Sequence, residues 1–206
     1  MAGLAMSRVR ASKHELKRQR DALARFQRYL PTLRLKQQQL QVELRRVEAL
    51  VHETSDQEAE VQRELQTWID LWSEPMPLSV YLTLEEVRRG EASVAGVSIP
   101  TLEGMSWRQL APPLDTTPPW VDEALIALEQ LMTLRLQRRV LAEQRSLLAA
   151  ELRLTSQRVN LFEKVKIPEA QEALRVIRIA LGDLQAAEVV RAKIAKAKAL
   201  EREQSA

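Results

Sequence analysis

The chain has 206 residues and no cysteine, and its 31 lysines and arginines against 28 aspartates and glutamates give a formal net charge of +3. The lack of cysteine excludes a disulfide framework, a thiolate metal site and cysteine catalysis, and it is typical of a reducing compartment. The two histidines, His14 and His52, lie far apart in the sequence, which argues against a zinc site. Few glycines and aromatic residues, among abundant Leu, Ala, Glu, Gln, Arg and Lys, indicate long helices rather than a thick globular core.

The first half of the chain carries a stripe of mostly apolar residues spaced alternately three and four apart. Its members are Leu23, Phe26, Leu30, Leu33, Gln37, Leu40, Leu44, Val47, Val51, Thr54, Glu58, Val61, Leu65, Trp68 and Trp72. A mean spacing of about 3.5 residues keeps these side chains on one face of a helix that supercoils left-handed against a partner helix. At about 1.5 Å per residue the predicted helix is on the order of 75 Å long. Pro31 removes one backbone donor, so we expect a bend there.

Three members of this stripe are polar, namely Gln37, Thr54 and Glu58. One interpretation is that they fix the register of the helix pair or loosen it where partners bind, because polar seam residues lower stability and raise specificity. The other is that the stripe faces solvent at these positions because the partner helix has ended or splayed away. The sequence favours neither.

The middle of the chain, residues 75–119, is bracketed by prolines and predicts a β-hairpin. The segments Val80–Val87 and Ser93–Leu102 are rich in β-formers, and Arg88–Glu91 between them predicts the turn. Because an isolated two-stranded hairpin is marginally stable in water, we expect this one to pack on the helices or on another protein. Trp68, Trp72 and Trp120 flank the insert, either as caps on the end of the seam or as a partner-binding hot spot.

A second stripe follows Trp120, and its phase slips by one residue close to Pro168. Before the slip its members are Leu131, Leu134, Arg138, Leu141, Arg145, Leu148, Leu152, Thr155, Val159 and Phe162. After the slip they are Ile167, Ala170, Leu174, Ile177, Leu181 and Leu184. The slip predicts a kink or local unwinding at Ile167–Pro168.

These patterns predict a mainly α fold: a long antiparallel two-helix left-handed coiled coil with a small β-hairpin insert between the helices. The predicted divisions are residues 1–74 for the first long helix, 75–119 for the hairpin and its proline-rich connections, and 120–206 for the second long helix, kinked near Pro168.

No catalytic motif is present: the sequence has no phosphate-binding loop, nucleophile elbow, His-Glu-x-x-His pair or dinucleotide fingerprint. We therefore expect a non-enzyme with no cofactor and no metal. No apolar run reaches the roughly 20 residues that span a bilayer, and the first residues lack an apolar signal core. The basic N-terminal stretch has three interpretations, which are a solvated face, a surface for an acidic protein partner, and nucleic-acid binding. The last is disfavoured because interleaved aromatic residues are lacking.

Three short stretches resemble the family of D subunits of V-type (A/V-type) rotary ATPases. One is the opening Ala11–Leu16 with the Leu-rich, Gln-rich run Leu33–Leu40, and the second is the Gly-Val-x-Ile-Pro sequence within Ala92–Pro100. The third is similar to the family's Arg-Val-Asn and Ile-Pro set and comprises Arg158, Val159, Asn160, Glu163, Ile167 and Pro168. The likeness spans nearly the whole chain.

The resemblance implies a non-catalytic central stalk, or rotor shaft, present in a single copy per complex. Such a shaft couples ATP hydrolysis or synthesis in a ring of A and B subunits to H⁺ or Na⁺ transport. The implied partners are the F, A, B and C subunits of the V-type ATPase, with no nucleic acid and no direct membrane insertion. The implied location is cytoplasmic and peripheral to the membrane through the complex. The alternative is a generic coiled-coil adaptor or tether, which would not be expected to need the hairpin.

Two sets of contact residues follow as hypotheses from the resemblance. Basic residues at the two chain ends would face the acidic inner loops of the ring: Lys13, Lys17, Arg18, Arg25, Arg191, Lys193 and Lys196. Hairpin residues would lie near the F subunit: Val94, Gly96, Val97, Ile99 and Pro100.

Overall fold

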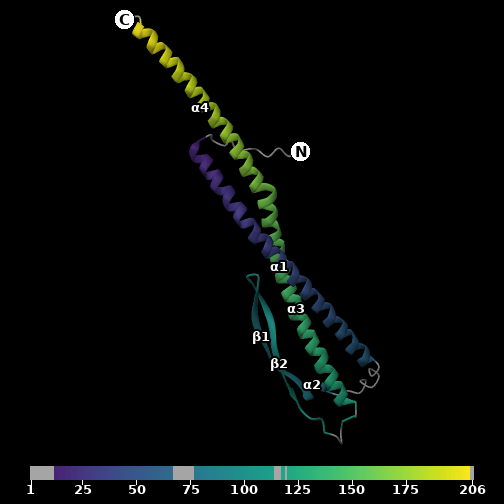
Figure 1. Cartoon of the computed structure of the whole chain (residues 1–206). Coiled ribbons are helices and arrows are strands. Elements are labelled where there is room, and N and C mark those ends of the chain that lie inside the picture. The colour runs from purple at the N-terminus through teal and green to yellow at the C-terminus, as the bar shows by residue number, and fades with distance from the viewer. Residues whose placement is uncertain (1–11, 67–76, 114–116, 119, 205–206) are drawn as a thin grey trace. The chain divides into compact units, whose positions relative to one another are not determined.

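The computed structural model describes residues 12–66, 77–113, 117–118 and 120–204, and it is mainly helical (Figure 1). The chain forms two compact units: Lys36–Thr155, and Met1–Leu35 together with Ser156–Ala206. The long helices α1 (Lys13–Gln66) and α3 (Val121–Leu161) contribute to both units. The predicted fold class, long helices with a two-stranded antiparallel hairpin between them, is confirmed.

In the unit Lys36–Thr155, α1 and α3 pair in opposite directions. Lys36 Nζ lies 2.6 Å from Glu151 Oε1, whereas further along α1 Glu58 Oε1 lies 3.0 Å from Arg135 Nε. Rising numbers on α1 therefore meet falling numbers on α3, which is the predicted antiparallel arrangement.

The predicted stripe on α1 forms the buried seam. The buried residues of α1 are Leu40, Val47, Thr54 and Glu58, and every one belongs to the stripe. Thr54 is 7% exposed and Glu58 is 5% exposed, so the interpretation in which these two polar residues face solvent is wrong. The Thr54 hydroxyl is satisfied within the helix because it donates to the Leu50 carbonyl at 2.7 Å.

The hairpin consists of β1 (Leu82–Val94) and β2 (Val97–Gln109), and it is longer than the sequence predicted. The predicted turn at Arg88–Glu91 is wrong, because these residues lie within β1 and the chain reverses at Ala95 and Gly96. The predicted first strand also starts too early, because Leu78–Tyr81 forms the short helix α2.

The true turn is identified by its backbone conformation. Ala95 and Gly96 both have positive φ, at 49° and 77°. A two-residue turn of this hand matches the right-handed twist of the two strands, whereas a glycine alone does not specify a turn. Gly90 instead sits where a Cβ atom would collide with the Glu103 side chain and approach Thr101 Oγ1 to 2.9 Å, so its role is close approach within the sheet.

We predict that Gly96→Ala lowers the free energy of unfolding by about 1 kcal/mol, because a left-handed backbone costs an L-residue roughly that amount. No atom lies within 4 Å of a Cβ built on Gly96, so the cost arises from the backbone alone. Gly182→Ala is the matched control, because it adds the same methyl group in the open middle of a helix, where Ala is preferred. Urea unfolding should show a loss for the first variant, and the far-UV helical signal should be kept or raised in the second. A loss of equal size in both variants would contradict the turn assignment.

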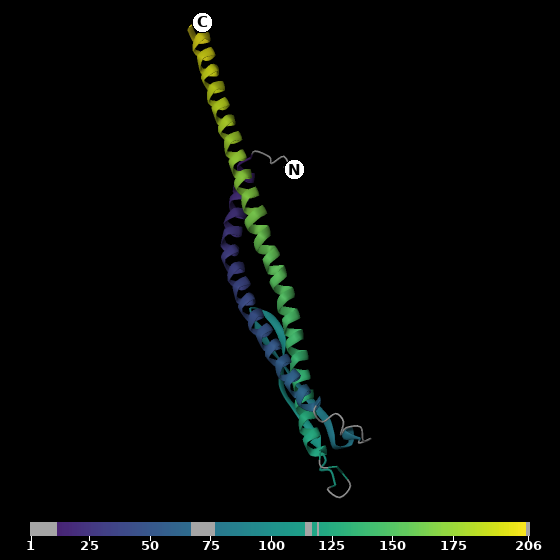
Figure 2. The same cartoon turned by 90° about the vertical axis from the view of Figure 1, so that its right-hand side faces the viewer.

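The hairpin packs along the helix pair and shares its core, and β1 and β2 lie beside α3 in both views (Figures 1 and 2). Ile99 of β2 joins Leu40, Val47 and Leu148 in one buried cluster. Gln144 Nε2 of α3 also donates to the Pro100 carbonyl at 2.5 Å. A second cluster of Leu82, Val121 and Leu125, flanked by Trp107 and Trp120, joins the base of the hairpin to the start of α3. Trp120 is partly buried and packs against this second cluster, at the start of α3, whereas Trp68 and Trp72 lie outside the described residues.

The other unit is built from the start of α1 and from α4 (Ile167–Gln204) with the last residues of α3. Ser12 begins α1 as an N-cap, because its Oγ accepts a hydrogen bond from the Glu15 N–H at 3.1 Å. The rings of Phe26 and Phe162 lie 5.3 Å apart, centroid to centroid. Val159, Ala170, Ala173, Leu174 and Ile177 form the buried side of this unit.

The predicted unwinding near Pro168 is a π-helical turn, η2 (Phe162–Lys166), directly before Ile167–Pro168. The Ile167 N–H bonds to the Phe162 carbonyl, five residues back instead of four. Such a turn takes up one extra residue, which is the size of the phase slip in the stripe. It also places Pro168 at the second residue of α4, where a missing N–H is tolerated.

The stripe on α4 ceases to be buried after Ile177. Phe26 of α1 lies against Phe162. Lys13, where α1 begins, lies thirteen residues before Phe26, and Arg175 lies thirteen residues after Phe162, so α1 begins at about the level where the burial of α4 ceases. Leu184 is 53% exposed although it continues the stripe, because no described part of α1 remains to cover it. Residues 182–200 form a helix exposed on every side.

Candidate functional site: the exposed end of α4 and the polar seam

The predicted basic end residues are all exposed, but they form two separate groups. Lys13, Lys17, Arg18 and Arg25 lie on the first turns of α1, and Arg18 pairs with Glu15 at 3.0 Å. Arg191, Lys193 and Lys196 lie on the part of α4 that extends past the start of α1, as both views show (Figures 1 and 2). The structure does not bring the two groups together.

The far end of α4 combines cations with apolar residues. Arg191, Lys193, Lys196 and Lys198 follow one another without an intervening acid. Val190 and Ile194 are more than half exposed beside them. A single helix with its side chains is about 10–12 Å across, so this segment can enter a narrow channel that a helix pair cannot.

The predicted hairpin residues face the helix pair more than they face solvent. Ile99 is 4% exposed and belongs to the core, and Val94 and Val97 pack against the same cluster. Pro100 is half-buried and uses its carbonyl to hold Gln144. Only Gly96, in the turn, is exposed.

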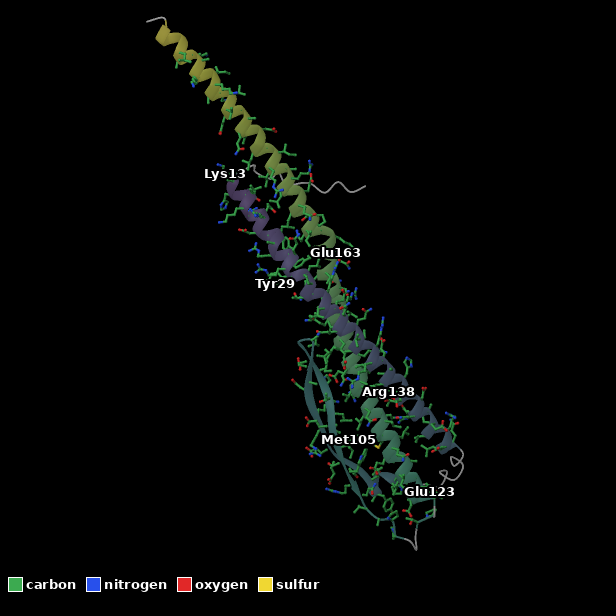
Figure 3. The ribbon with its side chains drawn as sticks, in the orientation of Figure 1. Lys13, Tyr29, Met105, Glu123, Arg138 and Glu163 are labelled. Carbon is green, nitrogen blue, oxygen red and sulfur yellow. The ribbon has the colours of Figure 1, made fainter. Side chains whose placement is uncertain are left out.

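The six family-motif residues surround η2. Val159 is buried in the seam. Glu163, which Figure 3 labels, pairs with Arg34 of α1 at 2.7 Å. Arg158, Asn160 and Pro168 are exposed, and Ile167 is half-buried. The motif thus joins a seam residue, an interhelical ion pair and the π-helical turn within one unit.

Sequence reasoning missed a cluster in the seam of the other unit. The buried Glu58 carboxylate contacts Arg135 Nε at 3.0 Å and Arg138 Nε at 3.2 Å. In the sequence, the cluster could have been found only from one glutamate, Glu58, in the first stripe and one arginine, Arg138, in the second. Gln62 Nε2 adds a weaker hydrogen bond to Glu58 at 3.4 Å.

Other ion pairs also join different elements, because Arg89 of β1 contacts Glu143 of α3 at 3.6 Å, whereas several others lie within one helix turn. On α4, the hydrogen bond from Arg175 lowers the pKa of the Glu172 carboxyl, and both groups are exposed.

A shallow cavity of about 200 Å³ in the unit Lys36–Thr155 is lined by the end of α1 and the first turns of α3, including Leu65 and Ile126. In the described parts of the chain, no three His, Asp or Glu residues are grouped as metal ligands. Within the same residues, no helix is both long and apolar enough to cross a membrane.

The fold and these surfaces define a helix-pair protein with an inserted hairpin and a basic helix end that is exposed from 182 to 200 among the described residues. A family model described as the D subunit of ATP synthase matches residues 15–197. The chain therefore belongs to the family of ATP synthase D subunits.

Curated relatives agree over nearly the full length of both chains. The chain is 39% identical over 191 residues to the V-type ATP synthase D subunit of Borreliella burgdorferi, covering 93% of this chain and 95% of the relative. It is 30% identical over 204 residues to the protein of the same name from Chlamydia caviae, covering 96% and 97%. The Chlamydia abortus relative is 29% identical over 201 residues, with the same coverage.

Proposed function

We propose that this chain is the non-catalytic central stalk of a V-type rotary ATPase. In this role one copy stands within a ring of A and B subunits and turns as ATP is hydrolysed or made, which couples the ring to H⁺ or Na⁺ transport. The F and C subunits bind the same shaft outside the ring, and the chain is held at the cytoplasmic face of the membrane by its partners rather than by insertion.

The observation that carries this proposal is the form of α4. Among the described residues the helix is buried on one side as far as Ile177, and from 182 to 200 it is exposed and carries the basic residues Arg191, Lys193, Lys196 and Lys198. A paired region resists twisting better than one helix does, and a lone helix fits the centre of a ring. Contacts in such a ring must break at every step, which favours exposed charges worth about 0.2–1 kcal/mol each over a large apolar interface.

The direct test is assembly. The chain is co-expressed with candidate A, B and F subunits, and the purified complex is weighed by native mass spectrometry and assayed for ATPase activity. One copy per three A–B pairs, with the F protein bound, is the expected result. Several copies per ring, or a chain that remains outside it, would leave an adaptor as the better account.

We predict that reversing the four cations Arg191, Lys193, Lys196 and Lys198 to Glu weakens coupling without unfolding the helix pair. Four exposed contacts at about 0.5 kcal/mol each amount to roughly a thirtyfold loss of affinity. The measurement compares ATP-driven ion transport with ATP hydrolysis in reconstituted vesicles. The variant Lys193→Arg/Lys196→Arg/Lys198→Arg is the control, because it keeps every charge. Equal coupling in both variants would show that the charges serve solvation only.

A further inference from the structure

One face of α3 in the unit Lys36–Thr155 carries arginines and no acid. From Leu131 to Ala142 the helix has Arg135, Arg138 and Arg139 but neither Asp nor Glu, and Arg145 and Arg153 follow. Among the described residues, Arg139, Arg145 and Arg153 are exposed and no carboxylate pairs with them. Arg138 is marked on α3 in Figure 3.

The contacts on α3 place this face away from the hairpin. Val140 is buried, and Gln144 is held by the Pro100 carbonyl of β2. At about 100° per residue, the five arginines fall within an arc of about 120°, centred on the side of the helix opposite Val140 and Gln144. We call Arg135, Arg138, Arg139, Arg145 and Arg153 the arginine face.

Two of these arginines lie against the buried carboxylate of Glu58. Arg135 Nε donates a hydrogen bond to Glu58 Oε1 at 3.0 Å, and Arg138 Nε lies 3.2 Å from Glu58 Oε2 as an ion pair without a hydrogen bond. The side chains of Arg135 and Arg138 stay 53% and 46% exposed. Each guanidinium group also carries Nη donors, and in side chains that are about half exposed these donors can bind a second acceptor, with less orientational entropy to lose than an unpaired side chain has. One carboxylate cannot neutralise two arginines, so the face keeps a net positive charge.

The rest of the arc suits a closely packed protein segment. Ala142, Ser146 and Ala149 lie within the same arc and are exposed, so the floor between the arginines is flat and built of small side chains. No aromatic side chain occurs between Leu131 and Arg153, so the face lacks the stacking platform that single-stranded nucleic acid uses.

We propose that the arginine face docks an acidic segment of a protein partner, whose carboxylates bind the outward Nη donors. Charge complementarity of this kind sets orientation and the rate of association, and it weakens with salt. The surface is separate from the hairpin residues and from the basic chain ends considered above.

The test uses the full chain and a fluorescent helical peptide of three heptads with Glu at the first, fourth and fifth positions of each. The wild-type chain should bind this peptide, more weakly as salt rises, and should not bind the same peptide with Gln in place of Glu. The variant Arg139→Glu/Arg145→Glu/Arg153→Glu should raise Kd about tenfold or more. None of these three residues supports Glu58, so the fold should remain, as circular dichroism can verify.

The control variant, Arg46→Glu/Arg63→Glu/Arg108→Glu, changes the net charge equally at exposed arginines outside the face. Its Kd should stay close to that of the wild type. An equal rise of Kd in both variants would mean that the peptide responds to the overall charge of the chain and not to the arginine face, which would overturn the proposal. The proposal would also be overturned, in favour of a nucleic-acid partner, if the chain bound single-stranded DNA more tightly than the acidic peptide and the triple variant lost that binding. The assay needs no ring, so its result is independent of whether the chain acts as a central stalk.

Discussion

Leu148→Ala should lower the free energy of unfolding by about 3 kcal/mol, within the range of about 2–5 kcal/mol typical of buried leucines. Leu148 is fully buried at the point where α1, α3 and β2 meet, packed with Leu40, Val47 and Ile99. Truncation would leave a cavity between α1, α3 and β2, and all three elements would have to move inward to fill it. Because Ile99 loses a neighbour, the tip of the hairpin should also exchange its amide hydrogens faster.

The matched control is Leu147→Ala, one residue away. Leu147 is 40% exposed, so its truncation removes little buried area and should cost less than about 1 kcal/mol. Urea unfolding of the two variants, followed by circular dichroism, gives the comparison. Similar losses at both positions would contradict the placement of the seam.

Removing one residue from the π-helical turn should be tolerated, whereas removing one residue upstream should not. Deletion of Lys164 shortens η2 by the one residue that it takes up, so the stripe would run unbroken from Val159 to Ala170 along a regular α-helix. Pro168 would then lie inside a continuous helix, at a cost of about 3 kcal/mol, so the deletion is combined with Pro168→Ala.

The comparison variant deletes Arg153, also together with Pro168→Ala. This deletion rotates Thr155 and Val159 off the seam by about 100°. Both residues are buried, so we expect a loss of about 2–5 kcal/mol, against about 1 kcal/mol or less for the deletion in η2. Thermal unfolding distinguishes the two. An equal loss would mean that η2 does not absorb the phase slip.

The periodic part of the fold was accessible from the sequence. Spacing of three and four identified both stripes, and the slip near Pro168 located the local unwinding to within a few residues of η2. These features depend on the spacing of residues that are near one another in the sequence, so they can be recognised without knowing which distant residues pair. The turn was misplaced because Arg-Arg-Gly has the composition of a turn, whereas the actual reversal depends on the positive φ of Ala95 and Gly96.

The features that sequence reasoning missed depend on pairing between distant residues. Glu58 and Arg135 are 77 residues apart, and only the register of the helix pair brings them together. The alternation in β2 shows that Ile99 differs from its neighbours, but not whether its face packs on the helices or on a partner. The structure resolves this by placing Ile99 in the core, so a partner at the hairpin would meet the turn and the outer face.

The most direct test of the central proposal is to watch the chain turn. Because the sequence has no cysteine, Ser93→Cys on the exposed side of β1 creates one unique attachment point for a bead. With the A–B ring fixed to a surface, ATP should drive stepwise rotation of the bead in one direction, and the rotation should stop when ATP is removed. A bead that stays fixed while the same complexes hydrolyse ATP would contradict the assignment of this chain as the rotor.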